Sequence, residues 1–372
     1  MLIHNAVVFV DGGFHRDIAV RTQGERIAAL GALRAEPGEE IFDARGHFLL
    51  PGFVDIHIHG CAGYDTMQGE AAVRRMAQHL GEQGVAAFLP TTMSASPADT
   101  LQALRGVRAA MARPSHGAQV LGAHMEAPFM CAQYGGAQDT AHFTLPSPEA
   151  YAALTGEAAD IVRLMTLAPE LPGSRALMAV LTAQGVRIAC AHSAATAEQL
   201  HEAADWGLSQ VTHLFNAQTP LHHRQPGIPG AALTDARVAV QVIADMIHLH
   251  PDAVRLALLA KRGQAQGVLL ITDAMMAAGM SDGVYTLGGQ QVTVQNGAAR
   301  LANGALAGST LTLHRALRNL IVGLGIAPEE AVPLATEAPA RSIGAQDVGR
   351  IAVGCRAAFA LMDGGWHFVQ AL

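Results

Sequence analysis

Two histidines, His57 and His59, stand one residue apart at the end of an apolar run that begins at Phe53. In a β-strand, residues i and i+2 project from the same face, so both imidazoles would point the same way near the carboxyl end of this strand. Two neutral imidazoles on one face provide half of a metal site. An isolated pair of this kind is more often structural, so a metal site requires further ligands from elsewhere in the chain.

Other apolar runs also end in histidines or carboxylates, which are Glu126, His192, His213, Asp245 and Asp273. One or two such residues at equivalent positions are expected by chance, but six run ends with a ligand or a carboxylate are not. The pattern therefore indicates a common site to which several separate segments contribute.

These side chains suit a cofactor of one or two divalent metal ions, Zn²⁺ or Fe²⁺. One site would consist of Glu126, His192 and His213, with an open position for water. A second would consist of His57 and His59, with Glu126 as the bridging carboxylate. Because such an ion lowers the pKa of a bound water to about 7, the centre would generate a nucleophile at neutral pH.

Asp273 follows the last apolar run, in Ile271-Thr-Asp-Ala274. There it is well placed to accept the proton of the attacking water and later to return it to a leaving amine. An aspartate after a strand is also a common helix N-cap, which is the structural alternative. That kind of alternative is weaker for Glu126, because an unpaired carboxylate inside an apolar run is costly.

These residues can form one site only if the strands that carry them have their carboxyl ends close together. Residues 51–344 alternate regularly between apolar runs and helical patterns. Eight such units indicate an α/β fold, a TIM-like (β/α)₈ barrel with its active site at the carboxyl ends of the strands. An open doubly wound sheet is the alternative, but no Gly-x-Gly-x-x-Gly follows the first strand. The predicted strands are Phe53–His59, Val85–Pro90, Val120–Glu126, Ile161–Leu167, Val186–His192, Gln210–Phe215, Val238–Ala244 and Val268–Asp273. Helices are predicted at Glu70–Gly81, Pro97–Ala112, Ala197–Trp206 and Pro251–Lys261.

Both ends of the chain contain short strand-like segments. Residues 1–50 alternate such segments with turns, and Gly349–Gly354 and Ala357–Met362 have strand-like sequences again. We therefore expect residues 1–50 and 345–372 to form one small β-sandwich domain, with a barrel domain of residues 51–344 inserted between them.

The composition limits the classes of partner and location. Of 372 residues, 50% are apolar and 15% are charged, so a sizeable core is expected rather than disorder. The formal net charge is −7 and no basic run occurs, which argues against nucleic acid as a partner. Four widely spaced cysteines indicate a reducing, cytoplasmic location. No apolar run reaches the roughly 18 residues that a membrane span needs, so no membrane partner is expected.

Short motifs over nearly the whole chain resemble those of the amidohydrolase superfamily and, within it, of the N-acetylglucosamine-6-phosphate deacetylases. Each motif is weak alone, but their order and spacing together are specific to that family. They are Pro51-Gly-Phe-Val-Asp-Ile-His-Ile-His-Gly60, His124-Met-Glu126, Thr166-Leu-Ala-Pro-Glu170, Ala191-His-Ser193, Thr212-His-Leu-Phe-Asn-Ala217, Arg224-Gln-Pro-Gly227, Ile243-Ala-Asp245 with His248, Thr272-Asp-Ala274 and Leu306-Ala-Gly-Ser309.

The resemblance implies a metal-dependent enzyme that hydrolyses the N-acetyl group of N-acetylglucosamine 6-phosphate to glucosamine 6-phosphate and acetate. It implies Glu126, His192 and His213 as the principal metal ligands. It also implies Asp273 as the general base and acid.

The resemblance further implies the residues that bind the substrate, a small amino-sugar phosphate. Asn216 and Ala217 resemble contacts to the sugar phosphate, and His248 resembles one half of a phosphate clamp. Arg224 resembles the other half, which one subunit of a homodimer contributes to its partner. A guanidinium suits this role because it grips phosphate bidentately. Without the family, Arg224 reads as a solvated loop arginine.

Gln138 is the main departure from the family, which usually has a histidine there to polarise the acetyl carbonyl. A glutamine amide still donates a hydrogen bond to a developing oxyanion, although it carries no charge. A second ion held by His57 and His59 would polarise the carbonyl instead. Alternatively the substrate differs, and is N-acetylgalactosamine 6-phosphate, a sugar phosphate with another acyl group, or an unphosphorylated N-acyl amide. A non-catalytic sugar-phosphate sensor is the alternative from another class, and the complete ligand set argues against it.

Lysine usage excludes a neighbouring branch of the superfamily. Dihydroorotase-like and hydantoinase-like relatives bridge two metals with a carboxylated lysine at the end of the fourth strand. The corresponding segment, Arg163–Ala168, contains no lysine, and Lys261 is the only lysine of the chain. A glutamate from the third strand must therefore supply any bridge.

Overall fold

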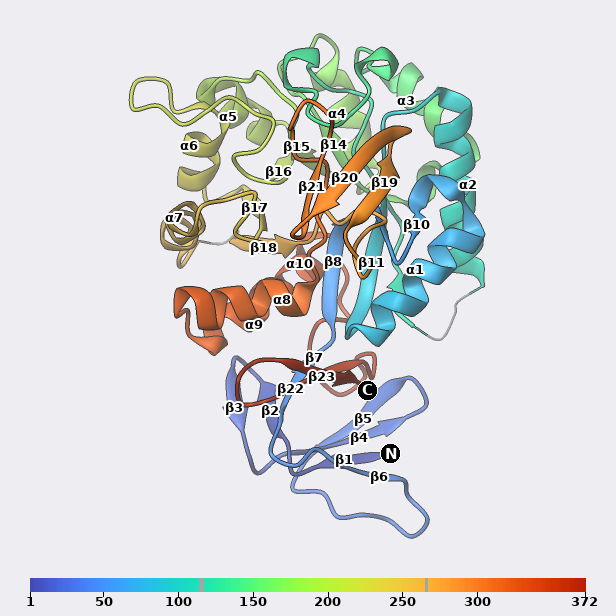
Figure 1. Ribbon diagram of the computed structural model, residues 1–372, viewed down its shortest axis with the longest axis vertical. Coiled ribbons are helices and arrows are strands. Elements are labelled where there is room, and N and C mark those ends of the chain that lie inside the picture. Colours follow the sequence, from blue (N-terminus) through green and yellow to red (C-terminus); the bar gives the residue numbers. More distant parts are fainter. Residues whose placement is uncertain (114–116, 265–266) are drawn as a thin grey trace.

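The computed structural model describes residues 1–113, 117–264 and 267–372. Its centre is a nearly closed barrel of eight parallel strands, which confirms the predicted α/β barrel (Figure 1). All eight predicted runs form strands, and the third is split in two. The strands are β8 (Phe53–Ile58), β11 (Val85–Thr92), β12 (Gln119–Val120) with β13 (Ala123–Met125), β14 (Val162–Leu167), β15 (Arg187–Cys190), β16 (Leu208–Val211), β17 (Ala239–Ile243) and β18 (Val268–Ile271). Every residue of β8 and β11 is buried, as expected for parallel strands that are covered on both faces.

The barrel closes between β18 and β8, where a few hydrogen bonds replace a regular ladder. Asp273 N donates to His57 O at 2.9 Å, and His59 N donates to the carbonyl of the residue after Asp273, also at 2.9 Å. Asp55, buried inside β8, accepts a hydrogen bond from Thr272 Oγ1 at 2.6 Å across the same seam. This seam places the histidine pair of the first strand beside the aspartate that follows the last strand.

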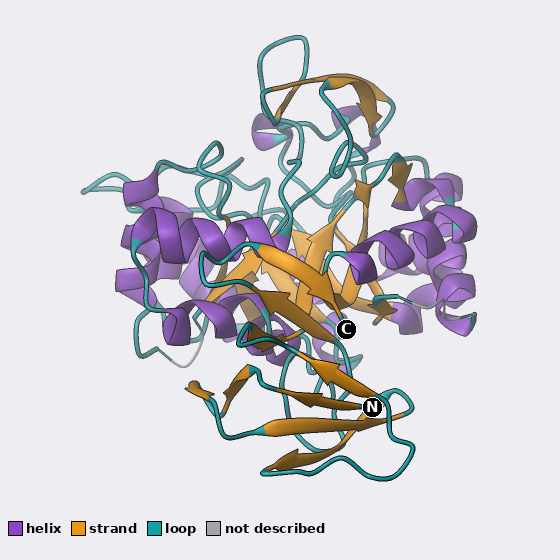
Figure 2. Ribbon diagram, turned by 60° about the horizontal axis from the view of Figure 1, so that its bottom comes forward, coloured by secondary structure: helices purple, strands orange, loops and turns teal. Residues whose placement is uncertain are grey.

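Helices surround the barrel (Figure 2). The four predicted helices are confirmed, as α1 (Glu70–Glu82), α2 (Pro97–Ala112), α5 (Ala197–Asp205) and α7 (Pro251–Lys261). The further helices are α3 (Pro148–Thr155), α4 (Ser174–Ala183), α6 (Gly227–Thr234), α8 (Leu313–Arg318), α9 (Pro328–Ala335) and α10 (Glu337–Ser342). Within the part of the chain that the structure describes, no helix is both long and apolar enough to cross a membrane.

Local sequence signals determine where these helices begin. Ser96 precedes α2, and its Oγ accepts a hydrogen bond from Asp99 N at 3.2 Å. Pro97 occupies the first position of α2, where a missing backbone donor costs nothing. Thr196 and Gln199 form a capping box at the start of α5. These caps explain why the predicted starts of α2 and α5 agree with the observed ones.

Two small sheets are built from both chain ends, as predicted. Their strands are β1 (Leu2–His4), β2 (Val7–Val10), β3 (Gly13–His15), β4 (Ala19–Gln23), β5 (Arg26–Gly31), β6 (Ile41–Asp43), β7 (Phe48–Pro51), β22 (Phe359–Met362) and β23 (Phe368–Ala371). One sheet has the order β5-β4-β1-β6 and the other has the order β23-β22-β7-β2-β3. In the second sheet β22 and β7, from opposite ends of the chain, pair antiparallel. The domain boundaries, with residues 1–50 and 345–372 in one domain and 51–344 in the other, stay a prediction.

The expectation of a strand at Gly349–Gly354 was wrong, because this segment forms bends and a turn. Gly349 and Gly354 have φ of 76° and 87°, and such positive values interrupt an extended strand. The segment nevertheless contacts the small sheets, since Gly354 N donates to Ile27 O at 2.9 Å.

A three-stranded antiparallel sheet, which we call the flap, was not predicted. It consists of β19 (Gly283–Leu287), β20 (Gln290–Gln295) and β21 (Ala298–Arg300), and it lies at the end of the barrel where β8 and β11 terminate (Figure 1). Its signals are present in the sequence, because Gly288-Gly289 and Asn296-Gly297 are typical hairpin turns. The flap follows the last barrel strand and so extends the wall of the barrel mouth.

Candidate metal centre and substrate cavity

The predicted metal ligands form one buried cluster at the mouth of the barrel. Two groups of three residues each bring their ligand atoms within 4.8 Å of one another, and these are His57, His59 and Glu126, and Glu126, His192 and His213. All five side chains are buried. Because Glu126 belongs to both groups, the geometry fits two metal ions that share a bridging carboxylate.

Both oxygens of the Glu126 carboxylate lie close to the histidines, and Oε1 serves both groups because it also lies 3.5 Å from His57 Nε2. Oε1 lies 3.1 Å from His213 Nε2 and 3.4 Å from His192 Nε2. Oε2 lies 3.1 Å from His59 Nε2. Within each histidine pair the two Nε2 atoms are also close, at 3.2 Å for His192 and His213 and 3.3 Å for His57 and His59. Lone pairs in such contacts repel one another unless a proton or a metal ion lies between them.

The opposite ring nitrogen of three of these histidines lies near an oxygen. The contacts are His192 Nδ1 to Tyr134 O at 2.8 Å, His59 Nδ1 to Thr91 O at 3.3 Å and His57 Nδ1 to Gln241 Oε1 at 3.4 Å. Since a carbonyl oxygen only accepts, the ring proton belongs on Nδ1 and the lone pair on Nε2. Metal-binding histidines are commonly oriented in this way by their surroundings.

Electrostatics in the cluster favour a bound cation. Burial alone would raise the pKa values of its carboxyl groups, but the neighbouring histidines outweigh burial. They hold the pKa of Glu126 well below its usual range and lower the pKa of Asp273 to about 2. Burial also opposes the charge of His59, yet its bonds to Asp273 and Glu126 raise its pKa to about 10. Two ionised carboxylates in a buried site require compensating positive charge, which protonated histidines supply without a metal and divalent ions would supply in their place.

The backbone bends sharply where the functional side chains leave their strands. His192, His213 and Asp273 have φ of 46°, 32° and 49°. A non-glycine residue in this left-handed region costs on the order of 1–3 kcal/mol, and such strain concentrates at functional sites. Phe215, Ala217 and Met246 in the neighbouring loops also have positive φ, so the segments that follow several barrel strands share this tight backbone conformation.

Asp273 lies beside the histidine pair, with Oδ1 3.3 Å from Nε2 of both His57 and His59. Its backbone is held from two sides, because its carbonyl also accepts a hydrogen bond from Ser309 N at 2.8 Å. Gly308 permits this approach, since an added Cβ there would lie 3.0 Å from Asp273 O. The carboxylate is thus held rigidly next to the metal ligands, where a general base is expected.

Gln138 contacts the cluster directly. Its Oε1 accepts a hydrogen bond from Ser94 N at 2.7 Å, which determines the orientation of the amide. Its Nε2 then donates to Glu126 Oε2 at 2.6 Å. One N–H of the amide therefore supports the bridging carboxylate, and the second N–H is available to another acceptor.

A cavity of about 510 Å³ opens onto the cluster and contains three of the predicted substrate-binding residues. Asn216, Ala217 and His248 line it together with Asp273. His248 Nδ1 lies 2.7 Å from Asp245 Oδ2, and this contact orients the imidazole. The polar end of the cavity is therefore built from the segments that follow β16 and β17.

Arg224 is the predicted substrate-binding residue that does not line this cavity. It is exposed, in a tight turn closed by a bridge between His222 and Gln225, and its Nη1 lies 2.8 Å from His223 Nε2. Figure 1 shows the loop between β16 and α6 extending away from the barrel. A side chain on this loop is accessible to a second molecule.

Some cavity residues were not singled out from the sequence. Leu287 and Arg300 come from the flap, and Ala305 follows it. Their residue types are ordinary, and none of them stands at the end of a barrel strand. The two hairpin turns were the available signal for the flap, but they carry no information about its position over the cluster.

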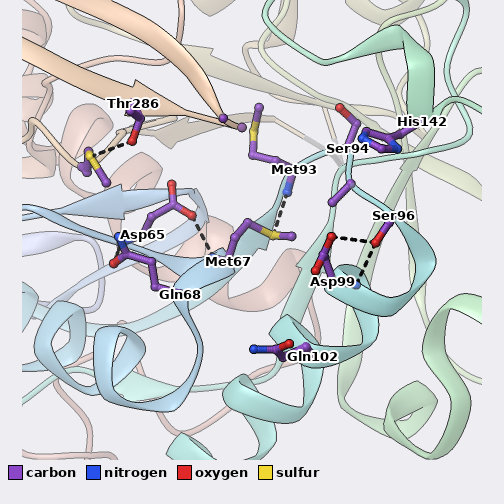
Figure 3. A pocket seen from close by; sticks show the side chains of 14 residues that line it. Asp65, Met67, Gln68, Met93, Ser94, Ser96, Asp99, Gln102, His142 and Thr286 are labelled. Atoms are coloured by element: carbon purple, nitrogen blue, oxygen red, sulfur yellow. Dashed lines mark hydrogen bonds between the residues drawn. The ribbon is translucent and has the colours of Figure 1, made fainter.

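Figure 3 shows a second cavity, of about 370 Å³, whose lining includes Met93. Met93 lines both cavities. Its backbone N lies 3.4 Å from Met67 Sδ, and its methyl group contacts the flap turn, where an added Cβ on Gly288 would lie 3.1 Å from it. The Met93 side chain thus forms part of the wall between the two cavities. Asp65, Ser94, Ser96, Asp99 and Thr286 are among the other residues around the second cavity.

Known proteins are similar to this chain over most of its length. The model of the amidohydrolase family matches residues 48–371. An N-acetylgalactosamine-6-phosphate deacetylase of Escherichia coli O157:H7 is 39% identical over 324 residues, which cover 87% of this chain and 85% of the relative. An N-acetylglucosamine-6-phosphate deacetylase of Lysinibacillus sphaericus is 36% identical over 367 residues, which cover 98% of this chain and 94% of the relative.

Solved structures agree with these sequence relatives. An N-acetylglucosamine-6-phosphate deacetylase from Pasteurella multocida has a TM-score of 0.92 at 25% identity, and the match covers 100% of this chain and 97% of the other. A variant of the Mycobacterium smegmatis enzyme in complex with N-acetyl-D-glucosamine-6-phosphate has a TM-score of 0.90 at 30% identity, with the same coverage. The resemblance seen in the sequence motifs is thereby confirmed.

Proposed function

Because the chain belongs to the amidohydrolase family, we propose that it is a metal-dependent deacetylase of amino-sugar phosphates. Its substrate is N-acetylglucosamine 6-phosphate, and the products are glucosamine 6-phosphate and acetate. Relatives named for this activity, from Lysinibacillus sphaericus and Homo sapiens, are 36% and 35% identical to the chain. The buried pair of ligand groups that share Glu126 is the observation that carries the proposal.

The metal centre consists of Glu126, His192 and His213 for one ion, and of His57 and His59 with Glu126 for a second. Bound divalent ions, Zn²⁺ or Fe²⁺, supply Lewis acidity and an activated water. The family histidine that would assist them is replaced by Gln138. In our proposal the free N–H of the Gln138 amide donates to the acetyl oxygen as negative charge develops there.

Asp273 moves the proton in this reaction. Its ionised carboxylate accepts a proton from the attacking water while the oxygen of that water bonds to the acetyl carbon. When the carbon–nitrogen bond breaks, Asp273 returns the proton to the sugar nitrogen, and acetate leaves with the oxygen from water. The low pKa of Asp273 keeps it in the basic form at neutral pH.

The sugar phosphate occupies the end of the cavity near His248. Asn216 and Ala217 contact the sugar phosphate, and His248 binds the phosphate group. Arg224 completes the clamp from the partner subunit of a homodimer, and its exposed position supports this assignment.

A reducing, cytoplasmic location fits the four cysteines, all of which are free thiols. They are Cys61, Cys131, Cys190 and Cys355. Disulfides are rare in cytosolic proteins, so their lack of pairing supports this part of the proposal.

N-acetylgalactosamine 6-phosphate is the second candidate substrate. The relative that is named for this activity is 39% identical to the chain, and the Lysinibacillus sphaericus relative named for N-acetylglucosamine 6-phosphate is 36% identical. The two sugars differ only in the configuration of the hydroxyl group on carbon 4, whereas the N-acetyl group that would be cleaved is on carbon 2. An unphosphorylated N-acyl amide is a weaker candidate, since it leaves His248 and Arg224 without a role.

Acetate release from a panel of four sugars tests the proposal. The panel consists of N-acetylglucosamine and N-acetylgalactosamine, each with and without the 6-phosphate. We expect kcat/KM to be highest for one of the phosphorylated sugars and to fall at least about tenfold without the phosphate. Equal kcat/KM with and without phosphate would remove the phosphate clamp from the proposal, and the lack of any acetate release would overturn it.

A further inference from the structure

Arg300 is the one arginine among the residues that line the catalytic cavity, and no lysine lines it. It comes from β21 of the flap, where its backbone pairs with Thr293 and forms a bridge to Leu306. The side chain is exposed. A fully cationic group is therefore present on the chain's own side of the cavity, at a position that no motif indicated.

The guanidinium of Arg300 is only partly occupied. Its Nη1 donates to Gly304 O at 2.8 Å, which turns the group back over the hairpin. Among the described residues, the ion pairs of the chain do not include Arg300. The remaining N–H groups are thus available to a ligand in the cavity, in the fork geometry that matches phosphate oxygens.

A phosphate group in the cavity is favoured by a nearby cation. The chain as a whole has a formal charge of −7, so its overall field does not attract an anion. A phosphate monoester carries a charge of about −1.5 to −2 at pH 7, so it meets an unfavourable field unless cations are close. His248 lines the cavity, whereas Arg224 lies outside it in a single chain.

We propose that Arg300 binds the phosphate of the substrate from the same chain whose metal centre cleaves it. This inference rests on the proposed deacetylase function and adds a residue that determines specificity for phosphorylated sugars. The flap then has a defined task, because it carries this arginine to the cavity mouth. Arg300 acts in binding, and it does not touch the reacting atoms.

The test compares Arg300→Ala and Arg300→Lys with the wild-type protein on the phosphorylated and unphosphorylated sugar. For Arg300→Ala we expect kcat/KM for the phosphorylated sugar to fall roughly 10- to 100-fold, mainly through KM, as is usual for a lost charge-assisted hydrogen bond. For the unphosphorylated sugar we expect a change of less than about twofold, because no phosphate is present to lose this contact. Arg300→Lys should recover part of the loss, since it restores the charge without the fork.

Arg350→Ala is the matched control, because Arg350 is also exposed and also donates to a nearby backbone oxygen, Gln346 O at 3.0 Å, but lies outside the cavity. This variant should leave kcat/KM unchanged for both sugars. An equal loss on both sugars would show that Arg300 only supports the hairpin, and an unchanged KM would overturn the inference while the deacetylase function stands. A wild-type protein that is inactive on every phosphorylated sugar would overturn both.

Discussion

Asp273 is the residue on which the proposed proton transfers depend. Its Oδ1 lies 3.3 Å from Nε2 of His57 and of His59, yet Asp273 belongs to neither of the two groups of three ligands. For Asp273→Asn we therefore expect kcat to fall by about 10³-fold or more, because the amide cannot accept the proton. Metal content, measured by atomic emission, should stay near the wild-type value.

A loss of metal in Asp273→Asn would reassign Asp273 as a ligand. Near-normal turnover with normal metal content would contradict its role as the base.

In our proposal Gln138 supports Glu126 with one N–H and the acetyl oxygen with the other. Gln138→Leu removes the donor to Glu126 Oε2 and leaves Ser94 N without its acceptor. We expect kcat to fall by about 10²- to 10³-fold, the usual effect of losing one oxyanion donor. Gln138→His, which restores the residue that the family usually has, should retain far more activity than Gln138→Leu in the same acetate-release assay. If both variants match the wild type, the amide has no part in catalysis.

At the scale of single residues, the sequence identified the side chains that have unusual chemistry. Histidines and carboxylates at strand ends are conspicuous because apolar runs seldom end in them. Leu287 and Arg300 were not identified, because each is an ordinary residue type and its function depends on where the flap lies. The positive φ of His192 and His213 could not be predicted either, since it is imposed by tertiary packing.

At the scale of elements, Lys261 connects α6 and α7. Its Nζ donates to Ala232 O at 3.2 Å, to Asp235 O at 2.9 Å and to Gln264 Oε1 at 2.5 Å. Ala232 and Asp235 lie at the end of α6, the helix that follows the loop of Arg224, and Gln264 follows α7. The only lysine of the chain is therefore a structural residue, consistent with its predicted lack of a role in metal binding.

Lys261 predicts a pH dependence of stability. Burial lowers its pKa from 10.5 to about 8, so between pH 8 and 10.5 the unfolded chain binds a proton that the folded chain lacks. Over this window the contribution of Lys261 to the free energy of unfolding should rise with pH, by at most about 1.4 kcal/mol per unit. Below pH 8 it should be constant, because the group is protonated in both states.

Denaturant unfolding of the wild type and Lys261→Met at several pH values from 7 to 10 measures this contribution as a difference. Other titrating groups cancel in the comparison of the two proteins. A difference that stays flat or falls above pH 8 would contradict the lowered pKa.

Barrel strands and their helices could be predicted because each has a strong internal period and definite ends. The flap was missed although Gly288-Gly289 and Asn296-Gly297 mark its turns. Its strands lie outside the alternation of strands and helices from which the barrel is predicted. The prediction of a strand at Gly349–Gly354 was wrong because its apolar residues suggested a strand, whereas its two glycines adopt positive φ and prevent one.

At the scale of the whole molecule, the proposed homodimer predicts complementation between two defective proteins. Arg224→Ala lacks the arginine that it would give to its partner, and Asp273→Asn lacks the base. In a mixed dimer, the site that retains Asp273 receives Arg224 from the other subunit. The two proteins are unfolded and refolded together, with Asp273→Asn in excess. At low substrate concentration, the rate of deacetylation per Arg224→Ala chain should then rise toward the wild-type rate.

Arg300→Ala mixed with Asp273→Asn is the matched control for complementation. Because Arg300 is proposed to act within its own chain, the partner cannot replace it and activity should not recover. Recovery in both mixtures would place Arg300 in the partner's site, and recovery in neither would contradict the contribution of Arg224 between subunits.

The fold of the whole molecule was predictable because eight strand–helix units and strand-like segments at both ends leave few alternatives. The homodimer was expected from the family resemblance alone, since a single chain contains no direct sign of the surface that meets a second copy. Arg224 illustrates the limit: the sequence assigns it to a phosphate site, and in one chain it lies outside the cavity.

In our proposal the cluster around Glu126 binds metal, and this metal centre deacetylates an amino-sugar phosphate. The most direct measurement is acetate release from N-acetylglucosamine 6-phosphate and its galactosamine epimer by metal-free protein as Zn²⁺ or Fe²⁺ is added back. We predict no release without metal and a rise to a plateau as the ligand groups fill. Full activity in the metal-free protein, or none at any metal concentration, would contradict the account.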